Sequence, residues 1–229
     1  MQGLPPEGEP RGPRWVCLDV GETLVDETRA WSLWADMLGI PRLTFMAALG
    51  AVVATGGEHR DVFPMLGALD WRRHIPMVEA AYGGFQPGDL YPDALPCLAA
   101  LRARGYRVAI VANQPASRST ELRALGVDAE VVAMSEAMGV AKPHPDFFAR
   151  ALELMGNPEP DAVAYVGDRL DNDVAPARAA GMRAVWIRRG PWGVIGRPAP
   201  GAEPALTVRT LAELVDGIGE AWPPGSRER

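Results

Sequence analysis

Lysine is almost absent from this 229-residue chain: its 23 basic side chains comprise one lysine, and all the others are arginine. Arginine therefore fills nearly every position where a surface charge suffices. The exception, Lys142, is expected at a position where a compact ammonium on a flexible stem cannot be replaced by a planar guanidinium. The alternative is that lysine stands at this position by chance.

Cysteine is scarce as well. Cys17 and Cys97 lie far apart in apolar stretches of sequence. This placement argues against a disulfide framework, a zinc site or an oxidising compartment, and predicts two small buried side chains. The three histidines, His59, His74 and His144, are too scattered to suggest a metal cluster.

Long apolar runs and clusters of positive charge are also missing. No run approaches the length of a membrane span, and Met1–Arg14 is rich in proline, glycine and charge where a signal peptide has an apolar centre. We therefore expect a cytoplasmic protein without a membrane partner. A formal net charge of -6 without a Lys/Arg cluster argues against nucleic acid as a partner. Since no dinucleotide fingerprint or P-loop occurs either, another small molecule is the expected ligand.

Short apolar segments alternate with helix-like ones along most of the chain. Continuous apolar strands alternating with helices predict a parallel sheet covered on both faces, which is an α/β, Rossmann-like fold. Ligands of such sheets bind at the carboxyl ends of the strands. The expected strands are Trp15–Val20, Tyr106–Ala112, Glu130–Met134, Ala162–Val166, Ala184–Ile187 and a short one near Leu206; the expected helices are Pro92–Arg104, Ser117–Leu125, Pro145–Met155, Asp173–Ala180 and Thr210–Gly217.

The interval 26–90 interrupts this alternation, because it carries no strand signal. Apolar residues recur at helical spacing in Trp31–Leu38 and Leu43–Val53, which predicts an inserted α-helical cap domain. Trp31, Trp34 and Trp71 are expected in the core of this cap. The predicted organisation is a disordered tail at 1–13, an α/β core at 14–25 and 91–217 that contains a loop at 191–204, the cap at 26–90, and a C-terminal tail at 218–229.

Acidic residues follow two of the predicted strands. Asp19 ends the first strand, while Asp168 comes directly after another, with Asp173 close behind. Carboxylates that meet at one edge of a sheet need a cation or a proton to relieve their repulsion, and Lys142 can supply further positive charge. A single acidic strand end is usually a helix cap or a solvated turn. Together these residues predict an active site.

The sequence around these residues resembles the haloacid dehalogenase (HAD) superfamily, whose four motifs occur in a fixed order. The first is Asp-x-Asp-x-Thr-Leu, the second Ser or Thr followed by Asn, the third a lysine before proline, and the fourth Gly-Asp-x-x-x-x-Asp before Ala-Gly-Met. The resemblance extends from Trp15 to about Gly217. The matching residues are Asp19, Thr23 and Leu24 for the first motif, Asn113 for the second, Lys142 for the third, and Gly167, Asp168 and Asp173 for the fourth.

This resemblance implies a phosphatase-like hydrolase that uses Mg²⁺ and acts on a small phosphorylated substrate. Asp19 would attack phosphorus and form an aspartyl-phosphate, which water then hydrolyses. Mg²⁺ would be held by an oxygen of Asp19, the backbone carbonyl of Gly21, Asp168 and waters, some of them steadied by Asp173.

The remaining matched residues are assigned to the phosphoryl group in the same way. The resemblance implies that Lys142 neutralises the nucleophile and the transferring group, and that Asn113 donates a hydrogen bond to a phosphoryl oxygen. Thr23, which matches the threonine of the first motif, is also predicted to be a catalytic residue.

Two departures from the motifs alter the expected chemistry. The second Asp of the first motif protonates the leaving group in family phosphatases, and Gly21 cannot do so. The neighbouring Glu22 is expected to point elsewhere, because successive residues of an extended chain face opposite ways. Ala112 also lacks the hydroxyl of the second motif. Acyl and aryl phosphates, whose leaving groups need no proton, are therefore the expected substrates, and alkyl phosphates should react slowly.

Two alternatives stay open. A 2-haloacid dehalogenase also lacks the second Asp and displaces halide, which needs no proton, but it has no use for a metal site like that of Asp168 and Asp173. A catalytically weak protein that binds a phosphorylated ligand or a protein partner is the other alternative. The substrate and the oligomeric state cannot be predicted from this sequence.

Overall fold

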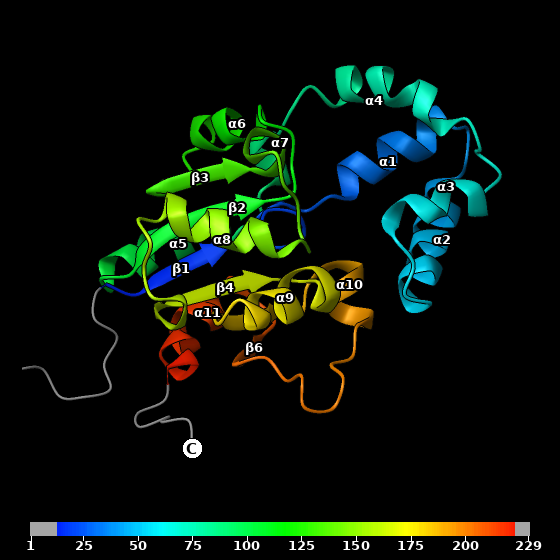
Figure 1. Cartoon of the computed structure of the whole chain (residues 1–229). Coiled ribbons are helices and arrows are strands. Elements are labelled where there is room, and N and C mark those ends of the chain that lie inside the picture. The colour runs from blue at the N-terminus through cyan, green and yellow to red at the C-terminus, as the bar shows by residue number, and fades with distance from the viewer. Residues whose placement is uncertain (1–12, 223–229) are drawn as a thin grey trace, which may run out of the picture.

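Six parallel strands form the central sheet of the computed structural model, which describes residues 13–222 (Figure 1). Their order is β3-β2-β1-β4-β5-β6, so the chain begins in the middle, winds to one edge and then returns to build the other half. The α/β, Rossmann-like fold class is thereby confirmed, and every predicted strand is present. The strands are β1 (Trp15–Leu18), β2 (Arg107–Ala112), β3 (Val131–Met134), β4 (Val163–Gly167), β5 (Arg183–Ile187) and β6 (Leu206–Val208).

Helices cover both faces of the sheet, which explains why the strands are apolar at nearly every position, apart from Arg107, Arg183 and Thr207. Alternate strand residues point to opposite faces. Val16 and Leu18 belong to the apolar cluster on the face of α5 and α11, whereas Cys17 belongs to the cluster on the face of α8 and α9. The core helices are α5 (Ala94–Ala103), α6 (Arg118–Ala124), α7 (Ser135–Met138), α8 (Pro145–Leu154), α9 (Ala175–Ala179), α10 (Gly190–Ile195) and α11 (Leu211–Gly217). Shorter turns occur at Pro160–Ala162, Leu170–Val174 and Ile218–Ala221.

Between β1 and α5 the chain forms a group of helices that lies beyond the carboxyl ends of the strands (Figure 1). We call residues 26–90 the helical insertion. Both predicted helices are present, while two shorter ones were not anticipated; the extent of the insertion as a domain stays a prediction. Its elements are α1 (Thr28–Met37), α2 (Arg42–Ala54), α3 (Val62–Met65) and α4 (Ile75–Tyr82), with 3₁₀ turns at His59–Asp61, Trp71–His74 and Pro87–Asp89.

The helical insertion has an apolar cluster of its own. Phe63 stacks on Trp71 with ring centroids 4.2 Å apart, and Trp34 meets Phe63 edge-on at 4.8 Å. Trp31 packs against the same cluster. The three tryptophans therefore lie in the core of the insertion, as their helical spacing predicts.

Two predictions about irregular segments are wrong. The loop expected at 191–204 begins with helix α10, whose Trp192 packs against the cluster of the insertion. The C-terminal tail was expected to begin at residue 218, but Ile218, Ala221 and Trp222 are buried and belong to the core. Trp222 stacks on Tyr106 at 5.9 Å, which holds this segment to the core. Nearly all of the predicted tail at 1–13, and residues 223–229, lie outside the described residues.

Helix length is modest throughout the described part of the chain. Between residues 13 and 222, no single helix combines the length and the apolar composition needed to cross a membrane. By those two criteria alone, α1 and α2 would pass as a pair, although they are bent by 115° where they join.

Candidate active site

Asp19 and Asp168 lie side by side at the carboxyl end of the sheet. They follow β1 and β4, which are neighbours in the sheet, and the Asp19 backbone N–H donates to the Val166 carbonyl over 2.9 Å. Strand order reverses at this pair of strands, which is where open α/β sheets form their binding crevice. The sheet topology thus brings two distant acidic residues together.

Asp173 joins this pair from a π-helical turn at Leu170–Val174. Oxygens of Asp19, Asp168 and Asp173 all lie within 4.8 Å of one another. A Cβ atom at Gly167 would overlap the Asp173 carboxylate, so glycine at this position allows the approach. We call the three aspartates the carboxylate cluster.

Lys142 is buried between two members of the carboxylate cluster. Its Nζ lies 2.7 Å from Asp19 Oδ1 and 2.6 Å from Asp173 Oδ1. Burial alone would lower the pKa of Lys142, but the two carboxylates outweigh it and raise this pKa above its ordinary value. The ammonium is therefore held in its charged form. It contacts Asp19 and Asp173, so the third carboxylate of the cluster has no cation beside it.

That carboxylate is Asp168. Its Oδ2 is buried and accepts no hydrogen bond within the described chain. Burial and the charges of Asp173 and Asp19 raise the pKa of Asp168 well above its ordinary range. Burial also raises the pKa of Asp173, to about 6, against the opposing effect of Lys142. A hard divalent cation that takes oxygen ligands would relieve both effects, so these residues fit the implied Mg²⁺.

Asn113 makes a contact that the sequence did not predict. Its amide donates to the Lys142 carbonyl over 2.9 Å, and its Oδ1 accepts from the Lys142 N–H over 2.8 Å. This side chain therefore positions the lysine. The second N–H of its amide could still donate to a phosphoryl oxygen, and that contact stays a prediction. Thr23 is fully buried, and its hydroxyl has no hydrogen-bond partner in residues 13–222.

The turn after β1 contains two glutamates with different surroundings. Glu22 points away from the carboxylate cluster as expected, because its two oxygens accept from the Tyr91 hydroxyl (2.6 Å) and the Glu27 N–H (2.9 Å). Glu27, which the sequence did not single out, is partly exposed and lies at the junction of core and insertion. Burial, Glu22 and Asp19 raise the pKa of Glu27 to about 7.

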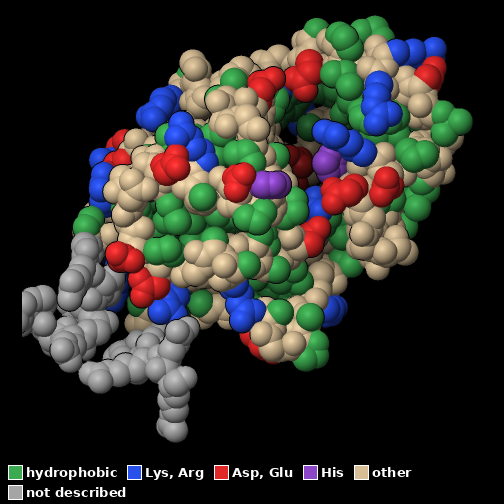
Figure 2. Space-filling model, in the orientation of Figure 1, with side chains coloured by type: hydrophobic (Ala, Val, Ile, Leu, Met, Phe, Trp, Pro, Cys, Tyr) green, Lys and Arg blue, Asp and Glu red, His purple; other side chains and the backbone are tan. Residues whose placement is uncertain are grey.

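The surface is hollowed between the core and the helical insertion, and acidic side chains lie inside the hollow (Figure 2). A cavity of about 120 Å³ opens there, on the side of Glu27. It is lined by aromatic side chains and by Arg118, which is buried and bridges Glu79 of α4 to Glu121 of α6. The cavity therefore has one wall from the insertion and one from the core.

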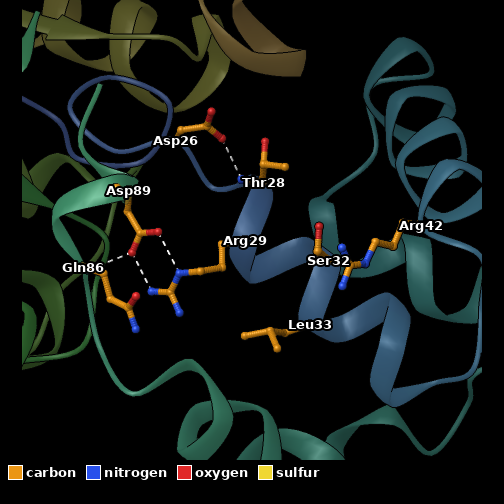
Figure 3. A pocket seen from close by; sticks show the side chains of 9 residues that line it. Asp26, Thr28, Arg29, Ser32, Leu33, Arg42, Gln86 and Asp89 are labelled. Carbon is orange, nitrogen blue, oxygen red and sulfur yellow. Dashed lines mark hydrogen bonds and ion pairs between the residues drawn. The ribbon is translucent and has the colours of Figure 1, made fainter. Parts of the chain in front are cut away.

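A second cleft, of about 430 Å³, lies at the base of the insertion (Figure 3). Neither this cleft nor the cavity beside Glu27 is lined by a member of the carboxylate cluster. In the second cleft Arg29 and Asp89 form a two-pronged ion pair with nitrogen–oxygen distances of 2.7 and 2.5 Å, and Gln86 also contacts Asp89 (Figure 3). This pair ties the start of the insertion to its end. We assign the cleft a structural role at the base of the insertion.

A family model for haloacid dehalogenase-like hydrolases matches residues 13–181. The match covers most of the chain and includes the carboxylate cluster, Lys142 and Asn113. The chain therefore belongs to the haloacid dehalogenase-like hydrolase family, and it is a hydrolase.

Two relatives with assigned activities are similar in sequence. A phosphoserine phosphatase of Thermus thermophilus is 39% identical over 196 residues, which are 79% of this chain and 76% of that protein. A glyceraldehyde 3-phosphate phosphatase of Methanopyrus kandleri is 36% identical over 133 residues. The second match spans 57% of each chain.

Solved structures share the fold over nearly the whole chain. A HAD phosphatase from Thermococcus onnurineus is 25% identical with a TM-score of 0.59, and the match covers 92% of this chain and all of that one. An L-2-haloacid dehalogenase from Xanthobacter autotrophicus, 21% identical, gives a TM-score of 0.63 over 90% of this chain and 98% of that one. Since phosphatases and dehalogenases share this fold, the residues of the site must decide between them.

Proposed function

We propose that this protein is a Mg²⁺-dependent phosphatase that hydrolyses a small phosphorylated metabolite through an aspartyl-phosphate on Asp19. The observation that supports it most is the composition of the carboxylate cluster. Lys142 neutralises part of it, but Asp168 keeps a buried oxygen that has no hydrogen-bond partner among residues 13–222. Such an oxygen suits a metal-assisted reaction at a strongly anionic substrate.

Each residue of the site has a part in this reaction. An oxygen of Asp19 attacks phosphorus, and the carboxylate is held in place by the Lys142 ammonium at 2.7 Å. The same ammonium stabilises negative charge on the transferring phosphoryl group, and Asn113 fixes the backbone that carries it. When bound by Asp19, Asp168 and the Gly21 carbonyl, Mg²⁺ supplies positive charge next to the phosphoryl oxygens.

The small cavity beside Glu27 suits a small leaving group. Trp34, Tyr82 and Phe85 line it together with Arg118, so a substrate with a short carbon skeleton would be enclosed on several sides. Phosphoserine and glyceraldehyde 3-phosphate, which occur in the names of the relatives, belong to this size class. We propose this class of substrate for the chain and no individual member of it.

Dehalogenation is the second candidate, because Gly21 leaves the first motif without its second carboxylate. A halide leaves without a proton, and its displacement needs no metal. The unpartnered oxygen of Asp168 has no purpose in that reaction, which favours phosphate chemistry. A weak enzyme that mainly binds a phosphorylated ligand is the third candidate.

The test is hydrolysis of 4-nitrophenyl phosphate and of acetyl phosphate by the purified protein, with Mg²⁺ and with EDTA. We expect turnover that requires Mg²⁺ and is lost in Asp19→Asn, whose side chain has nearly the same shape. Turnover of 2-chloropropionate that is insensitive to EDTA would support dehalogenation. Saturable binding of phosphorylated ligands without turnover would support the binding role.

A further inference from the structure

The position left empty by Gly21 is filled by the carboxylate of another residue. A Cβ atom built on Gly21 would lie 2.6 Å from Glu27 Oε1 and 3.0 Å from Glu27 Cδ. The first distance is close to that at which an aspartate holds its carboxylate oxygens from its own Cβ. One carboxylate oxygen therefore lies about as far from this Cβ as an oxygen of an aspartate at residue 21 would, while the carboxyl carbon lies further away than in an aspartate. The oxygen is carried by a residue six positions later.

The fold of the turn after β1 holds Glu27 at this position. Gly21 and Val25 form an isolated β-bridge, which brings the chain back beside its own start. The Glu27 N–H donates to Glu22 over 2.9 Å, and the Glu27 carbonyl accepts from the Trp31 N–H over 3.1 Å as α1 begins. The backbone of Glu27 is thus fixed on both sides, and its side chain extends toward Gly21.

The neighbouring acidic side chains cannot take this role. Both oxygens of Glu22 are engaged by Tyr91 and by the Glu27 N–H. Asp26 accepts from the Thr28 N–H over 2.8 Å and lines the cleft at the base of the insertion (Figure 3). Glu27 lines the other cavity, between insertion and core, where Gln114 follows directly after Asn113.

We propose that Glu27 is the general acid and base of this enzyme, replacing in space the carboxylate that the first motif lacks at Gly21. The inference rests on the proposed phosphatase function and adds a catalytic residue to it. It also replaces the expectation from sequence that alkyl phosphates react slowly, because a proton donor is now at hand for the leaving oxygen.

The reaction balances with Glu27 in this role. An oxygen of Asp19 forms a bond to phosphorus while the bond from phosphorus to the ester oxygen breaks. The Glu27 carboxyl proton moves to that ester oxygen, so the alcohol leaves neutral and Glu27 becomes a carboxylate. Water then attacks phosphorus and gives a proton to Glu27 while the bond to Asp19 breaks. Inorganic phosphate leaves, and both side chains return to their starting states.

The test compares phenyl, 4-nitrophenyl and 2,4-dinitrophenyl phosphate, whose leaving groups have similar shapes and differ in their need for a proton. In Glu27→Gln, kcat/KM for phenyl phosphate should fall by about 10² to 10⁴, while kcat/KM for the dinitro ester should change little. With the dinitro ester, this variant should release a burst of phenolate followed by slow turnover, because water is no longer activated. A purely structural role would lower all three rates together.

Two further variants complete the design. Asp26→Asn changes the adjacent carboxyl, which faces the other cleft, and should leave the dependence on the leaving group as in the wild type. Gly21→Asp combined with Glu27→Ala should restore turnover of phenyl phosphate relative to Glu27→Ala alone, because the new side chain enters the vacated space. Equal loss on all three esters in Glu27→Gln, or no loss, would overturn the inference and leave the proposed function intact. A wild-type protein inactive on all three esters would overturn both.

Discussion

At the scale of single residues, the site depends on one buried lysine in a chain that otherwise uses arginine. Lys142 contacts Asp19 and Asp173 with a single nitrogen, at 2.7 and 2.6 Å. A compact ammonium can sit between two carboxylates in this way, whereas a guanidinium is wider and planar. The scarcity of lysine therefore has a physical explanation at the one position where lysine remains.

Replacing Lys142 should be costly for both stability and activity. Lys142→Met leaves two buried carboxylates without their cation, and breaking such a buried pair typically costs about 3–5 kcal/mol. Urea unfolding at neutral pH without Mg²⁺ would measure this loss. Lys142→Arg should not recover activity, because the guanidinium does not fit. The control is Arg150→Lys on the exposed face of α8, and equal stability of Lys142→Met and this control would contradict the account.

The meeting of Asp19 and Asp168 could be predicted from sequence because strand ends fix their location, whereas Asp173 and Lys142 were predicted from the motifs of the family that the chain resembles. Asp19 and Asp168 follow buried strands, and neighbouring parallel strands end at the same edge of a sheet. Two other contacts depend on the paths of turns, which no residue pattern specifies. Asn113 grips the backbone of Lys142, and Glu27 reaches back to Gly21. The five residues between Gly21 and Glu27 hide the second contact from any motif.

At the scale of elements, strands were easier to predict than the segments between them. A strand buried on both faces needs an apolar residue at every position, which gives a continuous signal. The segments of Trp192 and Trp222 were expected to be a loop and a tail, yet each is anchored by the long-range contacts of one tryptophan. Contacts of one side chain leave no periodic pattern in the sequence.

The junction of the insertion with α10 should respond to pH through His59. Burial, and then Arg60 and Arg169, lower the pKa of His59 from 6.5 to about 4. A lowered histidine pKa means that the unfolded chain takes up a proton first as the pH falls. The stability contributed by neutral His59 is therefore present above pH 6.5 and is lost as the pH falls through about 4.

This pH dependence can be measured with His59→Gln, which does not titrate. Urea midpoints of the wild type should fall more steeply between pH 6.5 and 4 than those of the variant. His144→Gln, at an exposed histidine of the core, is the matched control and should follow the wild type. Parallel pH profiles for the wild type and His59→Gln would show that the junction does not sense this proton.

At the scale of the whole molecule, the helical insertion and the core meet through a few contacts around the site. Arg118 of α6 pairs with Glu79 of α4 at 2.9 Å, and Arg169 pairs with Glu58 at 3.3 Å. The Arg169 guanidinium also lies over Trp192, 5.1 Å from the ring centre. The Arg118–Glu79 pair lines the cavity beside Glu27. Closing the insertion over a substrate would exclude water from the reacting atoms.

Binding of Mg²⁺ should stabilise the whole fold, because the cluster is assembled only in the folded chain. A ligand at 100 times its Kd adds about 2.7 kcal/mol, which a thermal shift in MgCl₂ would detect against NaCl of equal ionic strength. Asp168→Asn should abolish the shift and should stabilise the metal-free protein, since it removes a buried charge repelled by Asp19 and Asp173. The same shift in wild type and variant would place the cation elsewhere.

The most direct test of the central claim is whether Asp19 itself becomes phosphorylated during turnover. The protein would be mixed with Mg²⁺ and 2,4-dinitrophenyl phosphate, quenched in acid within the first turnovers, digested, and examined by peptide mass spectrometry. The account predicts a phosphoryl group on the peptide that contains Asp19, located on that carboxylate, and more of it in Glu27→Gln than in the wild type. Phosphate release with no phosphoryl group on Asp19 in either protein would contradict the account.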